Sequence, residues 1–246
     1  MRTILSVLIC LSLSAPAIAT SVPESARSRA AVERVSDDLS RSLDRAGFHL
    51  GAPVFIRIFK RESELEVWLQ DGPAYRLFRK YRICAWSGDL GPKLKEGDRQ
   101  SPEGFYFVRT GQMNPHSSYH LSFNLGYPNA YDRAHGRTGS FLMVHGDCAS
   151  VGCYAMATGW FPFGRNRNRP IEEIWTMIDA AYGDGQPFIR VHAFPFRMTP
   201  ENMSRHKNDR WYDFWQNLKQ GYDWFESRKR PPDVFVENRR YRFRQD

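Results

Sequence analysis

Two residues of types suited to nucleophilic catalysis, His145 and Cys153, lie eight positions apart in the segment FLMVHGDCASVGCYAM. A cysteine attacks as its thiolate, and a nearby imidazole can hold that thiolate as an ion pair and then protonate a leaving amine. In a helix about 12 Å would separate the two residues, which is too far for proton transfer. Small and turn-forming residues between them, such as Gly146 and Gly152, instead predict a loop that doubles back. We therefore predict Cys153 as the nucleophile and His145 as its base.

The residues around this pair could orient and assist it. A catalytic imidazole needs a partner on its second ring nitrogen, and either Asp147 or a backbone carbonyl near Gly146 could serve. The sequence does not choose between them. Backbone amides around Gly152 and Cys153 are candidates for an oxyanion hole, and Gly152 would permit a tight turn before the nucleophile.

The same side chains also allow other interpretations. A buried cysteine is often an inert core residue. His145, Cys148 and Cys153 are acceptable zinc ligands, but the chain has no CxxC or HExxH spacing to complete such a site. It also lacks a GxGxxG or GxxxxGK[ST] phosphate loop. We therefore predict neither a metal nor a cofactor.

The N-terminus is typical of a secretory signal peptide. Arg2 precedes the short apolar stretch Ile4–Leu13, and Ala17-Ile18-Ala19 has the small-x-small pattern of a cleavage site. We predict a signal peptide over residues 1–19, and no later stretch is apolar enough to cross a membrane.

Export leaves an odd number of thiols in the mature chain, at Cys84, Cys148 and Cys153. In an oxidising compartment one arrangement pairs Cys84 with Cys148 and leaves Cys153 free. The sequence does not prove that pairing, and all three thiols could be reduced.

The formal net charge of +8 would attract acidic polymers. Export makes nucleic acid the least suitable of these and leaves anionic lipid or cell wall. A cationic surface without a specific partner is equally compatible with this charge.

Hydrophobic periodicity predicts many strands early in the chain and helices mostly late. This order indicates an α+β protein with a mainly β catalytic region, rather than alternating βαβ units. The expected helices are Glu24–Arg45, Pro170–Tyr182 and Asp209–Phe225, and a long loop is expected at 88–102. The expected strands are Val54–Phe59, Leu65–Leu69, Tyr75–Tyr81, Gly104–Arg109, Tyr119–Phe123, Ser140–Val144 and Phe188–Ala193, with Val234–Phe243 as a terminal strand or extended tail.

Four segments together carry a resemblance to a known family. ICAWSGDLGPK, GDRQSPEGFY, SSYHLSFNLGYPNAYD and the segment from His145 to Met156 resemble the L,D-transpeptidase (YkuD-domain) family, in its YafK-like branch. The resemblance implies a mostly β L,D-transpeptidase catalytic domain over residues 51–197. An N-terminal helical arm (20–50) would precede it and a helical C-terminal extension (198–246) would follow.

The resemblance also implies a reaction and a location. The family transfers acyl groups at meso-diaminopimelate-containing peptidoglycan stem peptides through a thioester on cysteine, without a cofactor. The implied location is the periplasm of a Gram-negative-type envelope. The family's nucleophile and base correspond to Cys153 and His145, and the serine and glycine before its cysteine correspond to Ser150 and Gly152. Its substrate-side aspartate, proline and glycine correspond to Asp98, Pro102 and Gly104.

This chain departs from the broader family, since Val151 stands where a histidine usually precedes Gly-Cys and the spacing from His145 is shorter. Two outcomes of the thioester therefore stay open. An amine acceptor would give a crosslink, whereas water would give a hydrolase that releases a covalently attached outer-membrane lipoprotein from peptidoglycan. A third alternative is a non-catalytic wall-binding protein.

Three further polar residues could line the substrate site: Tyr119 and His120 from the expected strand, and Ser118 just before it. For His120 a hydrogen-bonded structural role is the stronger interpretation. His192, which alternates with apolar residues in FIRVHAF, is expected to be structural.

Overall fold

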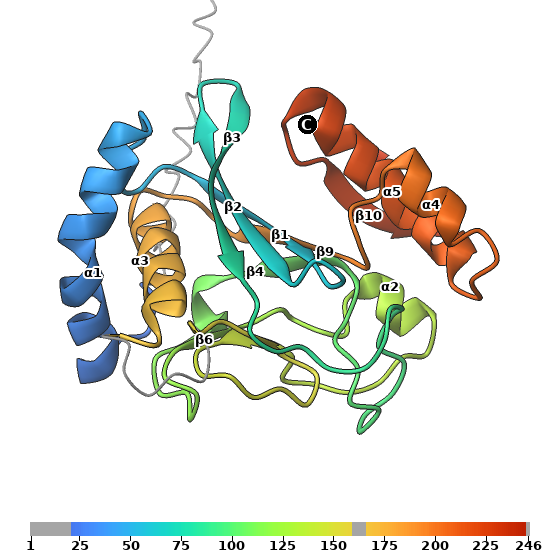
Figure 1. The fold of residues 1–246 in the computed structure, drawn as a ribbon, viewed down its shortest axis with the longest axis horizontal. Coiled ribbons are helices and arrows are strands. Elements are labelled where there is room, and N and C mark those ends of the chain that lie inside the picture. Colours follow the sequence, from blue (N-terminus) through green and yellow to red (C-terminus); the bar gives the residue numbers. More distant parts are fainter. Residues whose placement is uncertain (1–20, 159–165, 245–246) are drawn as a thin grey trace, which may run out of the picture.

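The computed structural model describes residues 21–158 and 166–244 of the 246-residue chain (Figure 1). The expected signal peptide at 1–19 lies outside the described residues. The helices are α1 (Ala26–Arg45), α2 (Ala130–Ala134), α3 (Arg169–Gly183), α4 (Pro200–Arg205) and α5 (Tyr212–Arg228), with a 3-10 turn at Thr110–Gln112. The strands are β1 (Val54–Phe59), β2 (Glu64–Asp71), β3 (Ala74–Arg82), β4 (Gly104–Val108), β5 (Met113–Asn114), β6 (Ser122–Asn124), β7 (Met143–His145), β8 (Tyr154–Ala155), β9 (Ile189–Phe194), β10 (Asp233–Glu237) and β11 (Arg240–Arg244).

A five-stranded sheet in the order β3-β2-β1-β9-β4 forms the centre of the molecule. Its middle strand β1 is buried along its whole length because both faces are covered. Since successive side chains of a strand point to opposite faces, Ile56 and Ile58 join the core under α3, whereas Phe59 joins the core under α5. Figure 1 shows α1 and α3 on one side of this sheet and α4 and α5 on the other.

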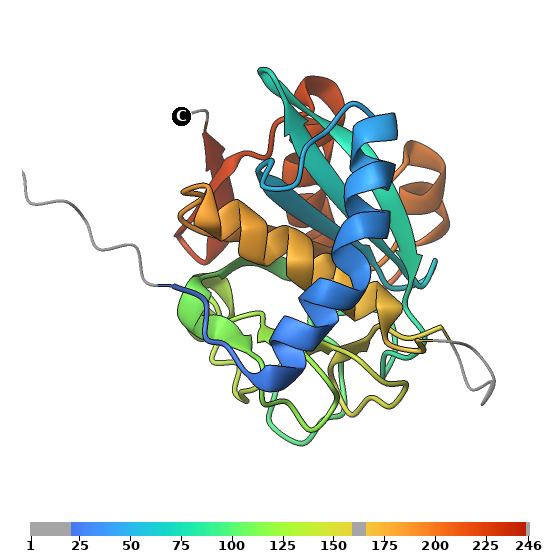
Figure 2. The same ribbon diagram turned by 90° about the vertical axis from the view of Figure 1, so that its left-hand side faces the viewer.

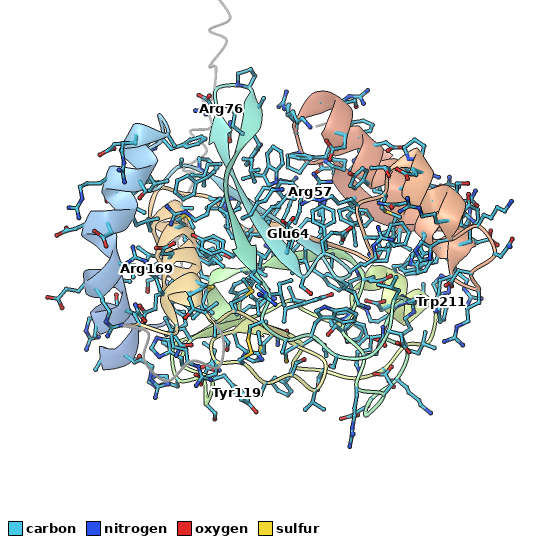
Figure 3. The ribbon with its side chains drawn as sticks, viewed as in Figure 1. Arg57, Glu64, Arg76, Tyr119, Arg169 and Trp211 are labelled. Atoms are coloured by element: carbon cyan, nitrogen blue, oxygen red, sulfur yellow. A yellow bond between two sulfur atoms is a disulfide. The ribbon has the colours of Figure 1, made fainter. Side chains whose placement is uncertain are left out.

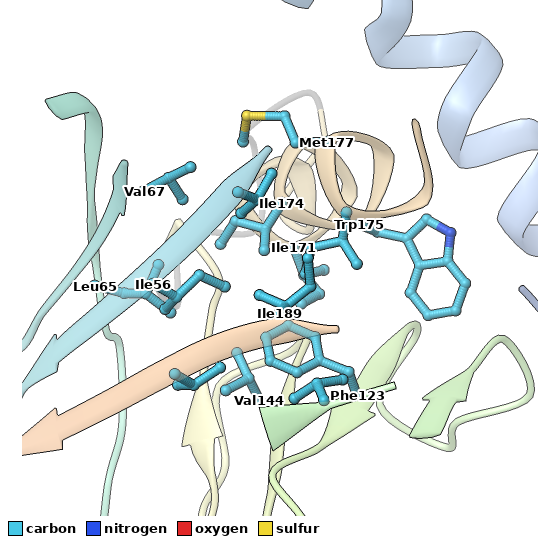
Figure 4. Close-up of a cluster of buried hydrophobic side chains, with 14 of the residues drawn as sticks. Ile56, Leu65, Val67, Phe123, Val144, Ile171, Ile174, Trp175, Met177 and Ile189 are labelled. Carbon is cyan, nitrogen blue, oxygen red and sulfur yellow. The ribbon is translucent and has the colours of Figure 1, made fainter. Parts of the chain in front are cut away.

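A second sheet, in the order β5-β6-β7-β8, lies below the central sheet in Figure 1 and carries the segment predicted to be catalytic. Phe123 of β6 and Val144 of β7 pack into the same apolar cluster as Ile189 of β9 and Ile174 of α3 (Figure 4). This shared core fixes the short strands of the second sheet against the larger one.

Helix α1 crosses α3 on the outside of the molecule (Figure 2). Its start is capped by Ser25, whose hydroxyl accepts the hydrogen bond of Ser28 N–H. Of the apolar residues that the sequence places at helical spacing, Val35, Leu39 and Leu43 are buried and Val32 is partly buried. Ala31 is buried with them. The helix thereby buries one apolar stripe and leaves its charged face in water.

The structure confirms the α+β class and most predicted elements, and it corrects three. Tyr119 and His120 lie in a turn and not in a strand, since only Ser122–Asn124 pairs at this place. Strand β7 begins at Met143, later than the expected Ser140. The segment 234–243 forms a hairpin of β10 and β11, so the C-terminal extension is not purely helical. The division into arm, catalytic domain and extension stays a prediction.

Within the described residues, no helix has both the length and the apolar character that crossing a bilayer would require.

Candidate active site

The pairing of β7 with β8 brings His145 and Cys153 to the same face of the second sheet. The two strands are parallel, with Val144 opposite Tyr154 and His145 opposite Ala155. Continued by one residue, this register places Cys153 opposite Met143, and the N–H of Met143 donates a hydrogen bond to the Cys153 sulfur (3.4 Å). Because Met143 and His145 are two positions apart on one strand, their side chains share a face, and Cys153 shares it with them. The doubled-back loop expected from the sequence is therefore present.

The thiol of Cys153 is partly buried and its hydrogen bonds go to backbone atoms. It donates to the carbonyl oxygen of Phe141 (3.7 Å) and accepts from Met143, and no hydrogen bond joins it to His145 in the part of the chain that the structure describes. Catalytic hydrogen bonds are often long before substrate arrives and tighten in the complex.

The His145 imidazole is buried and held by its Nδ1 atom, which is hydrogen-bonded to the carbonyl oxygen of Gly146. A carbonyl oxygen can only accept, so the ring proton is on Nδ1 and Nε2 carries the lone pair of the base. The Asp147 carboxylate is engaged elsewhere, by Arg167 (3.3 Å) and by Asn168 (3.4 Å). Of the two candidates for orienting the base, the structure selects the carbonyl of Gly146.

Burial determines the charge state of the pair. Loss of contact with water lowers the pKa of His145 and raises the pKa of Cys153, although the Met143 amide and the Lys93 ammonium oppose the second shift. Both shifts favour the neutral forms of the imidazole and of the thiol. The ion pair and the catalytic roles expected from the sequence stay predictions.

The main chain of Cys153 is clamped by two serine hydroxyls. Ser150 Oγ donates to the Cys153 carbonyl oxygen at 2.7 Å, and Ser101 Oγ donates to the same oxygen at 3.2 Å. Ser150 Oγ also accepts the N–H of Gly152 (3.2 Å), so that amide is not available to an oxyanion. The N–H of Cys153 makes no hydrogen bond to any described residue, which leaves it as the oxyanion donor.

Gly152 is required by its backbone conformation. Its φ of +132° is rarely adopted by residues with a side chain, and a Cβ there would lie 3.0 Å from Leu142. The turn that directs Cys153 toward β7 therefore depends on this glycine, as predicted.

A disulfide joins Cys84 to Cys148, with 5.7 Å between their Cα atoms, and Cys153 is free. This is the pairing that the sequence offered as one arrangement. It removes Cys148 from the alternative zinc set with His145, since a cystine sulfur is not a thiolate ligand. Among the described residues, no three histidine, cysteine, aspartate or glutamate side chains are grouped to hold a metal ion.

The three residues expected to line the substrate site have different surroundings. The Tyr119 ring packs on the His145 imidazole, with 4.6 Å between centroids (the position of Tyr119 is labelled in Figure 3). His120 is turned to Glu172, with 2.8 Å between Nε2 and Oε1, which fits the structural interpretation. Ser118 is exposed on the same turn.

The substrate-side motif residues build the loop that approaches Cys153. The Asp98 carboxylate accepts the N–H groups of Leu94 (2.8 Å) and Lys95 (3.0 Å), which closes the loop on itself. The Pro102 carbonyl oxygen accepts the hydroxyl of Tyr154 at 2.6 Å, next to the nucleophile. The side chains of Asp98 and Pro102 form no hydrogen bond to His145 or Cys153.

Sequence reasoning missed two residues that border the nucleophile. Ser101 donates to its carbonyl oxygen, and Phe141, whose own carbonyl oxygen accepts the Cys153 thiol, has 71% of its surface exposed at a φ of 55°. Val151, two positions before Cys153 in the chain, is 73% exposed. A bulky side chain at positive φ is an outlier that concentrates at functional sites. No pattern in the sequence marks Phe141, because its conformation depends on the surrounding fold.

Comparison with known proteins gives one clear relationship. No protein-family model matches the chain. Over 192 residues, which are 78% of this chain and 74% of the relative, it is 49% identical to the protein named "Putative L,D-transpeptidase YafK" of Escherichia coli strain K12, and equally to that of strain O157:H7.

Solved structures give weaker likenesses. Two crystal structures of the helical cell shape determining protein Pgp2 from Campylobacter jejuni are 19% and 17% identical, with TM-scores of 0.46 and 0.44. Each alignment covers 81% of this chain, and they cover 64% and 80% of the Pgp2 chains.

Proposed function

The chain belongs to the L,D-transpeptidase family, in its YafK-like branch, and we propose that it is a peptidoglycan-modifying cysteine acyltransferase. The proposed substrates are meso-diaminopimelate-containing stem peptides, and the proposed location is the periplasm, where such peptides lie. The 49% identity to a relative named as an L,D-transpeptidase supports the family, and the side chains at the site support the chemistry.

The observation that carries the proposal is the placement of one free cysteine beside one oriented imidazole. Cys153 is the free cysteine of the described chain, and it shares a sheet face with His145, whose Nδ1 is tied to Gly146. An inert core cysteine has no need of an imidazole with a fixed tautomer.

The first half of the reaction follows from these positions. As the Cys153 sulfur attacks a stem-peptide carbonyl, its proton passes to Nε2 of His145, and the carbonyl oxygen becomes an oxyanion facing the N–H of Cys153. When the tetrahedral intermediate collapses, the carbon–nitrogen bond breaks and the proton on Nε2 passes to the departing amine. A thioester on Cys153 remains.

The second half depends on the acceptor. An amine of another stem peptide loses its proton to His145, attacks the thioester and forms a new amide, while the thiol regains the proton. Water in the same place gives a free carboxyl group. We propose the amine as acceptor, and hydrolysis that releases a peptidoglycan-linked lipoprotein is the alternative outcome.

Two exposed apolar residues near Cys153 are suited to contact the substrate: Phe141, whose carbonyl oxygen accepts the Cys153 thiol, and Val151, two positions before Cys153 in the chain. The positive net charge of +8 suits an anionic wall polymer.

The test uses the mature protein with purified sacculi that carry covalently bound lipoprotein, followed by muropeptide analysis. New diaminopimelate–diaminopimelate crosslinks would support transpeptidation, and soluble lipoprotein without crosslinks would establish hydrolysis instead. Cys153→Ser must abolish either product, and a carbapenem should form one covalent adduct on Cys153. Sacculus binding without product or adduct would overturn the enzymatic proposal in favour of a wall-binding protein.

A further inference from the structure

Tyr119 lies on one face of the His145 imidazole. The ring centroids are 4.6 Å apart and the ring planes are inclined by 32°. Tyr119 is 45% exposed whereas His145 is 2% exposed, so the phenol ring lies between the imidazole and water. Within the described chain, Tyr119 donates a hydrogen bond from its backbone N–H to Ser117 Oγ, and its hydroxyl bonds to no described residue. The ring face is therefore the part of Tyr119 that acts on His145.

We propose that Tyr119 is a positioning residue for the base His145, and that helix α1 fixes it there through Arg27. This inference rests on the proposed catalytic role of His145. It gives the N-terminal helix a part in the site, although α1 contributes no side chain to the reacting atoms.

Arg27 of α1 holds the backbone on both sides of Tyr119. Its Nη1 atom donates to the carbonyl oxygen of Ser117 at 2.6 Å and to that of His120 at 2.9 Å. The N–H of Tyr119 donates to Ser117 Oγ at 3.1 Å. A single guanidinium therefore sets the position of a turn about ninety residues further along the chain, and hydrogen bonds from a charged donor are the stronger kind.

The His120 side chain fastens the same turn from the other direction. Its Nε2 lies 2.8 Å from Oε1 of Glu172, which is fully buried in α3 and also binds the guanidinium of Arg34 from α1 and the amide of Asn166. His120 has a φ of 69°, a conformation that residues with a side chain rarely adopt. A strained backbone conformation persists only where surrounding contacts hold it. Here the contacts of His120 with Glu172 and with Arg27 of α1 hold it.

The turn at residues 118–120 also packs closely against Gly146, the residue whose carbonyl oxygen orients His145. A Cβ at Gly146 would lie 2.8 Å from the Tyr119 carbonyl oxygen and 3.0 Å from the Cβ of His120. Gly146 carries the carbonyl that holds Nδ1 of His145. The turn therefore contacts the base twice, through the Tyr119 ring on the imidazole face and through Gly146 at its edge.

Removal of the ring would give the imidazole room to tilt and would admit water to it. Proton transfer from the thiol depends on a narrow range of geometries, so the fraction of productive complexes would fall. Because Tyr119 acts on the base and not on the bound peptide, kcat should change and KM should not.

The experiment compares Tyr119→Ala, Tyr119→Phe and Arg27→Ala, with Arg29→Ala as the matched control. Arg29 lies on the same helix, is exposed and pairs with Glu24. We expect Tyr119→Ala and Arg27→Ala to lower kcat about 10-fold with KM nearly unchanged. Tyr119→Phe and Arg29→Ala should behave as the wild-type protein.

An NMR titration of the ¹⁵N-labelled His145 ring in the full mature chain supplies a readout independent of turnover. Tyr119→Ala should move the titration midpoint up toward that of an exposed imidazole and reduce the Nδ1–H tautomer. A folded Tyr119→Ala protein with wild-type kcat, tautomer and midpoint would overturn the inference, as would equal losses in Tyr119→Phe. If the wild-type protein modifies no peptidoglycan, the proposed function fails, and the titration still decides whether Tyr119 positions the ring.

Discussion

The Nδ1 atom of His145 is hydrogen-bonded to the carbonyl oxygen of Gly146, its own neighbour in the chain. The base is thus oriented by the strand end that carries it, without a separate carboxylate. A neutral carbonyl fixes the tautomer but stabilises an imidazolium less than an aspartate would. The Nε2 atom therefore carries the free lone pair of the imidazole.

The first prediction concerns the acidic limb of the pH profile. The reaction needs neutral His145, and burial lowers the pKa of this imidazole below its ordinary value of 6.5. Activity should therefore persist below pH 6.5 and be lost only as the pH falls through the lowered pKa. His145→Gln should lower kcat/KM by about 10²- to 10⁴-fold. The measurement is kcat/KM between pH 4.5 and 8 in the wild-type protein, with the exposed His116→Gln as control. An acidic limb centred above 6.5 would contradict the neutral-base assignment.

The second prediction concerns the reactivity of Cys153 toward iodoacetamide. Alkylation requires the thiolate, and burial raises the pKa of this thiol. Labelling at neutral pH should be slower than that of a model thiol, and its rate should rise with pH to a midpoint above that of the model thiol. Mass spectrometry after timed labelling gives the rate. Fast labelling at pH 7 that is slowed by His145→Ala would instead restore the resting ion pair.

Sequence patterns predicted well the elements that have a distinctive local composition or spacing. Strand β1 was predicted at its observed bounds because Val54–Phe59 is rich in β-branched and aromatic residues, and α1 was predicted because its apolar residues recur at helical spacing. Residue type and spacing predicted Cys153 and His145 as nucleophile and base. The structure brings the two residues to one sheet face, and their catalytic roles stay a prediction.

Tyr119 and His120 were wrongly predicted to lie in a strand because the conformation of this turn depends on residues far away in the sequence. His120 takes a positive φ in contact with Glu172 and Arg27, which local propensity cannot indicate. For the same reason Ser101 was missed, since only the folded loop places its hydroxyl on Cys153.

The third prediction tests the serine clamp. Ser150→Ala removes one donor to the Cys153 carbonyl and the acceptor of Gly152 N–H, while Ser101 remains. We expect kcat to fall about 10-fold from misplacement of the nucleophile, and the free energy of unfolding to fall by about 1 kcal/mol. Steady-state kinetics and urea unfolding measure the two effects. The exposed Ser204→Ala, in α4, should change neither, and an unchanged kcat in Ser150→Ala would exclude the clamp from function.

The fourth prediction concerns the disulfide. The Cys84–Cys148 bridge closes a long loop and ties the segment before Cys153 to the segment that directly follows β3. Replacing both cysteines by serine should lower the free energy of unfolding by about 2–4 kcal/mol. Denaturant unfolding with and without dithiothreitol is the measurement. Reductant should destabilise the wild-type protein and leave the double variant unchanged, and any effect of reductant on the variant would show that another thiol is involved.

The fifth prediction concerns the effect of His192 on the pH dependence of stability. This residue is buried between the rings of Phe55 and Phe105, and the distance from its ring centroid to each of theirs is 4.7 Å. Neither ring nitrogen has a hydrogen-bond partner in the described part of the chain, and burial holds the pKa of His192 well below 6.5. The unfolded chain therefore binds a proton below pH 6.5 that the folded chain does not, so stability is present above 6.5 and is lost as the pH falls. The loss from this one group should be about 1 kcal/mol per pH unit below 6.5.

His192→Leu removes this proton linkage and the two unpaired nitrogens, at similar volume. At pH 8 the variant should be about as stable as the wild-type protein, because an apolar side chain replaces a polar one that has no partner. At pH 5.5 the variant should be the more stable by about 1 kcal/mol, seen as a higher Tm in thermal scans. His145 is present in both proteins, so its contribution to the pH dependence of stability is the same in each and cancels in the comparison. If the two proteins lose Tm in parallel between pH 8 and 5.5, His192 is protonated in the folded state and must have a hydrogen-bond partner.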